Sequence, residues 1–204
     1  MYSIIYLNSS EADILYAFVR KTDLKISILQ IANEIKKHYP NIYNSVKKLQ
    51  KNGLLKIETI GKANICSLNV NSLELPVYLA FVDELNSLQI LDKLPFLQNI
   101  INEAKRINPV VSIGVFGSYA SGTETKKSDI DLFILTDKVK EFKDFIPKYF
   151  PEFENKIDLN VISFEEFIAS LKSKQFTVSK EIVKSKRILT GAEIFYQILL
   201  ESNK

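Results

Sequence analysis

The chain has 204 residues, of which 46% are hydrophobic and 25% are charged, and its formal net charge is +3. This composition excludes a disordered or fibrous protein, and the length allows two modest domains, each with its own core. It contains no apolar run of about 18 residues, and residues 1–7 lack the positive start and the length of a signal peptide, which predicts a cytoplasmic protein. A single cysteine, Cys66, excludes an internal disulfide, and with only His38 beside it there is no ligand set for zinc.

Residues 1–75 are predicted to form a domain of their own, and its first half has the pattern of two short helices. Ser9 or Ser10 can cap the first helix by accepting a hydrogen bond from its first turn. A second helical pattern follows at residues 28–35. The apolar positions that repeat at helical spacing are Ile14, Leu15, Phe18, Val19, Ile28, Leu29, Ile31, Ala32 and Ile35.

The second half of this domain has the pattern of a third helix followed by a β-hairpin. Asn41 can cap the helix, and Gly53 can end it. Strands are predicted at residues 54–60 and 63–70, and Gly61-Lys62 between them suits a tight hairpin turn. Helices followed by a hairpin in this order are typical of a winged helix-turn-helix domain.

Such a domain places its third helix in the major groove of DNA and its hairpin beside the phosphate backbone. Residues 36–62 contain seven lysines and one acid, a net charge of +6 over the segment that would face phosphate. We therefore predict DNA binding, and the alternative is a solvated helix with a hairpin that serves dimerisation or another protein contact. The residues expected to contact DNA are Asn44, Lys47, Lys48, Lys51 and Lys62.

A helical linker at residues 76–94 is predicted to join the two halves of the chain. Its helix begins at Pro76 and runs to about Leu91, with apolar residues on more than one face. Such a helix suits burial between the domains or against a second copy of the chain, so a homodimer is one expectation. Pro95 can open a further helix that ends near Ile107.

A β-branched and aromatic run at residues 110–116 predicts a strand that stops at Gly117. Glycine lets a phosphate group approach the main chain closely, and amides at the start of the next helical turn can bind its oxygens together with the Ser118 hydroxyl. Gly122 gives the following loop further freedom. A Gly-Ser pair by itself, however, is more often a plain turn.

Asp129 and Asp131 open a second predicted strand, residues 129–135, and side chains two apart on a strand share a face. Two like charges so close need a cation, and magnesium prefers carboxylate and phosphate oxygens. Two such ions, roughly 3.5 to 4 Å apart, can clamp the attacking and leaving oxygens of an in-line displacement. The pattern therefore predicts two Mg²⁺ ions, with ATP or another nucleoside triphosphate as substrate.

A two-metal site usually has a third carboxylate, and the next strand-like run, residues 157–162, contains one acid, Asp158. The apolar residues of this run alternate with Asp158, which leaves its carboxylate on the face that could meet the first pair. We predict that Asp158 is a metal ligand or a base.

Together, Gly117-Ser118, Gly122, Ser128 and Asp129-Ile-Asp131-Leu resemble the signature of the DNA polymerase beta-like nucleotidyltransferase superfamily, and its small MNT-type (minimal) branch is the most similar. The resemblance spans roughly residues 95 to 200. It implies a nucleotidyltransferase domain at residues 95–204 with a mixed sheet flanked by helices, so the expected fold class is α+β throughout. The family's roles are triphosphate binding, magnesium binding and deprotonation of the attacking hydroxyl, and they map onto Gly117, Ser118, Asp129, Asp131 and Asp158.

In one respect the chain departs from that pattern. Many small relatives carry arginines inside the turn, where this chain has Tyr119 and Ser121. Lys126 and Lys127 can take over phosphate binding, or they can be a solvated pair on a loop. With Ser128, these two lysines complete the nucleotide-binding residues that we predict.

The leading hypothesis is a magnesium-dependent nucleotidyltransferase that moves a nucleoside monophosphate, with AMP from ATP as the first candidate, onto an acceptor hydroxyl. Pyrophosphate would leave, and the DNA-binding domain would localise the enzyme. The resemblance also suggests a partner protein such as a HEPN-domain toxin as acceptor, which would make the chain an antitoxin. The alternative is a DNA-binding transcriptional regulator whose transferase-like domain only senses nucleotide or holds a dimer.

Overall fold

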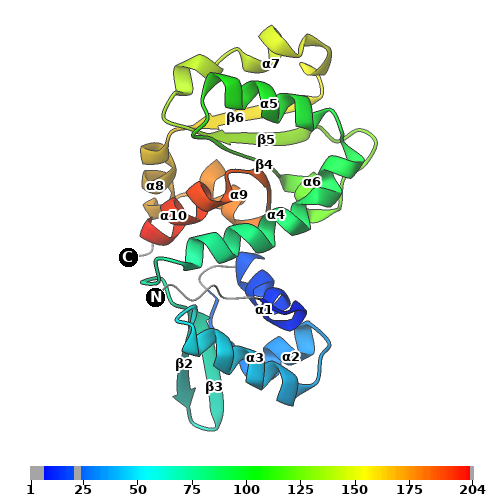
Figure 1. Ribbon diagram of the computed structural model, residues 1–204. Coiled ribbons are helices and arrows are strands. Elements are labelled where there is room, and N and C mark those ends of the chain that lie inside the picture. Colours follow the sequence, from blue (N-terminus) through cyan, green and yellow to red (C-terminus); the bar gives the residue numbers. More distant parts are fainter. Residues whose placement is uncertain (1–6, 21–23, 203–204) are drawn as a thin grey trace. The chain divides into compact units, whose positions relative to one another are not determined.

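The computed structural model describes residues 7–20 and 24–202. The chain divides into two compact units, Met1–Val82 and Asp83–Lys204, and the division falls within helix α4, Leu75–Lys93 (Figure 1). Helix α4 occupies most of the stretch predicted as a linker. In the two described ranges, no helix combines the length and the apolar character needed to cross a membrane. Residues 1–6, on which the expected absence of a signal peptide largely rests, lie outside the described ranges.

Within residues 7–20 and 24–74, the first unit contains three helices and a hairpin in the predicted order, and one short strand that was not predicted. The helices are α1 Ser9–Arg20, α2 Ile28–Glu34 and α3 Tyr39–Lys51, and the strands are β1 Ile26–Ser27, β2 Leu55–Ile60 and β3 Ala63–Leu68. The strands form an antiparallel sheet in the order β1-β3-β2, with Ile60 opposite Ala63 across the predicted turn. Strand β1 has only two residues, too few for a recognisable alternation of polar and apolar side chains.

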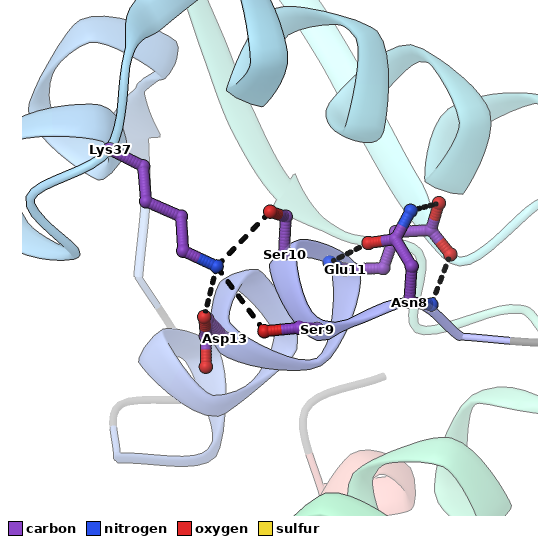
Figure 2. Close-up of polar contacts among 6 residues, drawn as sticks. All are labelled: Asn8, Ser9, Ser10, Glu11, Asp13 and Lys37. Atoms are coloured by element: carbon purple, nitrogen blue, oxygen red, sulfur yellow. Dashed lines mark hydrogen bonds and ion pairs between the residues drawn. The ribbon is translucent and has the colours of Figure 1, made fainter.

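The cap of α1 is Asn8, so the prediction of Ser9 or Ser10 was wrong. The Asn8 side-chain oxygen accepts a hydrogen bond from the Glu11 main-chain N–H at 2.9 Å, and the Glu11 carboxylate accepts one from the Asn8 N–H at 3.2 Å (Figure 2). The hydroxyls of Ser9 and Ser10 instead accept hydrogen bonds from the Lys37 ammonium group. All three consecutive residues are good caps, but only Asn8 has a glutamate three positions later to return the bond.

Helix α3 begins before the predicted cap, Asn41, which therefore lies inside its first turn. The N-cap position is His38, whose side chain makes no capping hydrogen bond, and Pro40 occupies the first turn. Proline fits there because the N–H that it lacks has no partner within the helix. The inner face of the helix is formed by Ile42, Ser45, Val46 and Leu49, all of them buried.

The second unit contains a mixed four-stranded sheet in the order β6-β5-β4-β7. Strand β4 is antiparallel to both of its neighbours, and β6 is parallel to β5. This mixed sheet with its helices confirms the α+β class predicted for this part of the chain. Its elements are α5 Leu97–Ile107, β4 Ser112–Phe116, α6 Gly117–Ser121, β5 Ile130–Leu135, η1 Val139–Phe142, α7 Phe145–Tyr149, η2 Pro151–Phe153, β6 Ile157–Ile162, α8 Phe164–Lys172, α9 Val178–Lys184, β7 Lys186–Thr190 and α10 Ala192–Ser202.

Helices cover this sheet on both faces (Figure 1). On one face, alternate residues of the strands pack with α5 in a single core; among them are Ile113, Val115, Ile130, Leu132, Ile134, Leu97, Ile100 and Ile101. On the other face, Phe133 of β5 lies 6.0 Å from Phe195 of α10, which in turn meets Phe167 of α8 at 5.5 Å between ring centroids. Because side chains alternate along a strand, Asp131 belongs to the face of Phe133.

A buried polar cluster joins the C-terminal part of α4 to α10 and β7. Asp83 is fully buried, and its carboxylate accepts a hydrogen bond from the Tyr196 hydroxyl at 2.7 Å. The Lys186 ammonium group lies over the rings of Phe195 and Tyr196, 5.4 and 5.5 Å from their centroids. Burial raises the pKa of Asp83 to about 6 and lowers the pKa of Lys186 to about 8. Both charges are therefore disfavoured by their surroundings.

This cluster predicts a pH dependence of stability. The folded Asp83 binds its proton up to about pH 6 and the unfolded one only to about pH 4, so ionisation of Asp83 costs stability as the pH rises between these values. Asp83→Asn removes this cost while its amide oxygen can still accept the Tyr196 hydrogen bond. As the pH rises from 4 to 6, the free energy of unfolding of Asp83→Asn should increase relative to that of the wild type by on the order of 2 kcal/mol. Urea denaturation at each pH measures this difference.

Asp92→Asn is the matched control, because Asp92 lies on the same helix but is exposed. Its free energy of unfolding should follow the wild type at every pH. If the free energies of unfolding of Asp83→Asn and the wild type changed with pH in the same way, the prediction would be wrong.

Candidate active site

The predicted phosphate-binding turn lies where β4 ends and α6 begins. Gly117 is the first residue of α6 and has φ +62°, a left-handed conformation that glycine adopts without strain. A Cβ atom at this position would stand 2.3 Å from the Asp131 Oδ2 atom. Glycine is thus required both by the backbone and by the approach of Asp131, and the turn packs directly against this carboxylate.

The three predicted acids lie at the beginnings of two adjacent parallel strands. Asp129 is exposed and directly precedes β5, and the pairing of β5 with β6 sets Asp131 opposite Asp158. Leu159 and Val161 pack against the core on the α5 side, so the alternation leaves Asp158 on the face of Asp131. The structure therefore brings the Gly117 turn, Asp131 and Asp158 side by side across three strands.

Negative charge accumulates around Asp131. Burial raises the pKa of this carboxyl group above its ordinary value, and the carboxylates of Asp158, Glu181 and Asp129 raise it further, in that order. Glu181 belongs to α9 and was not predicted, because it stands in an ordinary amphipathic helix without a motif. Only the folding of α9 towards the sheet brings this fourth acid near the predicted three.

The donor set suits magnesium in its chemistry, because carboxylate oxygens are the ligands that this ion prefers and because their repulsion favours a cation. As the side chains lie, however, no three His, Cys, Asp or Glu residues within ranges 7–20 and 24–202 are placed so that they could hold a metal ion. Magnesium binding by Asp129, Asp131 and Asp158 stays a prediction.

The loop between α6 and β5 contains the other predicted nucleotide-binding residues. The Ser128 hydroxyl accepts a hydrogen bond from the Thr125 main-chain N–H at 2.9 Å, so Ser128 helps to shape the loop. Lys126 and Lys127 lie in this turn and are exposed to solvent, where phosphate could reach them. Gly122 ends α6 in a left-handed conformation, with φ +72°.

The residues predicted to contact DNA all lie on the surface of the first unit: Asn44, Lys47, Lys48 and Lys51 on the outer face of α3, and Lys62 in the hairpin turn. The Lys48 ammonium group forms an ion pair at 2.9 Å with Glu11, whose side chain is only 1% exposed. The charge of Lys48 is therefore partly neutralised by its own unit, which the sequence pattern did not predict.

Comparison with known proteins agrees with the site in the second unit. Residues 97–190 match the family model of the nucleotidyltransferase domain. The matched stretch runs from the start of α5 to the end of β7 and contains the Gly117 turn and the three aspartates. The match supports a transferase and suggests nucleotide transfer as the activity of this domain. Neither the curated proteins nor the solved structures provide a match.

The contact between the turn and Asp131 predicts different outcomes for two glycines. Gly117→Ala and Gly122→Ala both place a Cβ at positive φ, which costs each variant about 1 kcal/mol of stability. Only the Gly117 variant also displaces Asp131, since nothing lies within 4 Å of a Cβ at Gly122. We expect Gly117→Ala to lose roughly 100-fold in nucleotide transfer, as misplaced reacting groups do, and Gly122→Ala to keep most of it. Equal rates for the two variants, measured with labelled nucleotide, would refute this role for the contact.

Proposed function

We propose that the chain is a magnesium-dependent nucleotidyltransferase that transfers a nucleoside monophosphate, with AMP from ATP as the first candidate, to an acceptor hydroxyl. One observation carries the proposal: within the stretch that matches a nucleotidyltransferase domain, the left-handed Gly117 turn packs against Asp131, and Asp158 stands opposite Asp131 on the next strand. Main-chain amides that could bind phosphate thus lie beside a concentration of carboxylates, which supports transfer of a nucleotidyl group to a hydroxyl.

In this proposal, the parts of the site have different roles. The main chain at Gly117 and the hydroxyl of Ser118 bind the outgoing phosphates. Asp129, Asp131 and Asp158 hold magnesium, which offsets the charge of the triphosphate. Asp158 also takes the proton of the acceptor hydroxyl, whose oxygen forms a bond to the α-phosphorus as the bond to the β-phosphate oxygen breaks and pyrophosphate leaves.

We further propose that the acceptor hydroxyl belongs to a partner protein, with a HEPN-type toxin as the candidate that the family resemblance suggests. The chain would then act as an antitoxin that modifies its partner covalently. Mass spectrometry of the protein that co-purifies with the chain, after incubation with ATP and magnesium, would detect an added AMP.

Nucleotide transfer can be tested with labelled nucleoside triphosphates, magnesium and candidate acceptors. The double variant Asp129→Ala plus Asp131→Ala should lose label transfer by at least about 100-fold, because the carboxylates that hold the cation are gone. The control is Glu152→Ala plus Glu154→Ala, which removes the same charge from two exposed acids at η2. Wild-type rates in the aspartate variant would end the enzyme proposal.

A second candidate function is DNA-binding transcriptional regulation, in which the transferase-like domain only senses nucleotide or holds a homodimer. The observation that favours it is the outer face of α3, where Lys47, Lys51 and Asn44 are exposed above a buried inner face. In combination with the following hairpin, this arrangement supports the winged helix-turn-helix interpretation. The two functions are compatible, since DNA binding would localise the enzyme.

If the chain binds DNA, its affinity should fall as the salt concentration rises. The slope of log affinity against log salt concentration should be about −0.9 for each phosphate that is neutralised. Lys47→Ala plus Lys51→Ala should reduce the steepness of this slope by up to about 1.8 on a mixed-sequence duplex, measured by fluorescence anisotropy. Lys48→Ala should change it less, because Lys48 is already paired with Glu11. Lys140→Ala plus Lys143→Ala, exposed residues of the other unit, are the control. An affinity independent of salt would remove this candidate.

A further inference from the structure

Two hydroxyl groups meet at the carbonyl oxygen of Gly117. Ser121, at the end of α6, donates a hydrogen bond from its Oγ atom to this oxygen. Ser185 donates a second from its Oγ atom at 3.4 Å, and the two hydroxyl oxygens lie 3.2 Å apart. The carbonyl of the phosphate-binding turn is thus held by one residue of its own helix and by one from much later in the chain.

The sheet explains why Ser185 reaches this turn. Ser185 follows α9, and its main-chain N–H donates to the Glu181 carbonyl at 2.9 Å, which ends that helix. The next residue, Lys186, begins β7 and pairs with Phe116, the last residue of β4. The pairing of β7 with β4 therefore places Ser185 beside Gly117.

The hydrogen bonds to the Gly117 carbonyl also orient the N–H donor of Ser118. The carbonyl of Gly117 and the N–H of Ser118 belong to one planar peptide group, and in the trans form they point in opposite directions. The described peptides are all trans. Two hydrogen bonds to the Gly117 oxygen therefore fix the direction of the Ser118 N–H, which is one of the amides available for phosphate at this turn.

We propose that Ser185, together with Ser121, positions the Gly117-Ser118 peptide so that its N–H is aimed at a phosphate oxygen of the nucleoside triphosphate. The inference rests on the proposed function and adds two positioning residues to its nucleotide site. Ser185 is a positioning residue, because it acts through the turn rather than on the substrate.

The test is nucleotide affinity, measured by titration calorimetry with magnesium and the α,β-methylene analogues of the four ribonucleoside triphosphates. Ser185→Ala should weaken binding about three- to tenfold, the usual effect of one lost hydrogen bond. Ser185→Thr, which keeps the hydroxyl, should restore it. The double variant Ser121→Ala plus Ser185→Ala should lose more than the product of the two single losses, because either hydroxyl can partly hold the carbonyl alone.

Ser163→Ala is the matched control. Ser163 caps α8 by accepting a hydrogen bond from Glu166, so its loss lowers the melting temperature of the same unit without touching the turn. Its nucleotide affinity should equal that of the wild type. In transfer assays, the KM of Ser185→Ala for the nucleotide should rise by the same factor as its dissociation constant.

The outcomes separate the two proposals. Wild-type affinity in Ser185→Ala, or failure of the threonine to restore it, would overturn the role of Ser185 and leave the transferase standing. A wild-type chain that binds none of the four analogues would overturn the proposed function, and the role of Ser185 would fall with it.

Discussion

The candidate site depends on a close approach of two strand ends. The Asp131 carboxylate occupies the space next to Gly117 that any other residue would fill with its Cβ. This contact ties the end of β4 to the beginning of β5, so the predicted phosphate-binding turn lies directly beside Asp131. The rest of the second unit holds these strands in register. One core lies beneath α5, and the aromatic rings of Phe133, Phe167 and Phe195 pack together beneath α8 and α10.

The close contact between the end of β4 and the beginning of β5 also lies where negative charge is concentrated. Four carboxylates gather at this corner of the sheet, and both burial and mutual repulsion raise the pKa of Asp131. Such a site is costly to the folded protein alone, and a bound cation would relieve that cost. Strain of this kind is common at functional sites, where the folded structure tolerates an arrangement that only the ligand makes favourable.

Much of the fold could be predicted because local signals are strong in it. Periodic apolar residues predicted α1 to α5 and the strands β2 to β6, and the alternation around Asp131 and Asp158 predicted their common face. The prediction of the α1 cap was wrong because several neighbouring residues are equally suitable as N-caps. Strand β1 was missed because two residues are too few to show an alternation of polar and apolar side chains. The contacts of Glu181 and Ser185 had no local signal, since Glu181 lies 50 residues from Asp131 (181 − 131) and Ser185 lies 68 residues from Gly117.

The pattern of residues along the chain indicates which kinds of chemistry are available: a glycine turn, three acids on strands, and a lysine-rich helix. They are recognisable because spacing along a strand or helix dictates which side chains share a face. Which of these groups lie next to one another depends on how the strands pair and pack. The parallel pairing of β5 with β6 set Asp158 opposite Asp131, and the pairing of β7 with β4 brought Ser185 to the Gly117 carbonyl. Such pairings follow from the packing of the whole sheet, because hydrogen bonds between strands join residues that are distant in the chain and carry no local pattern.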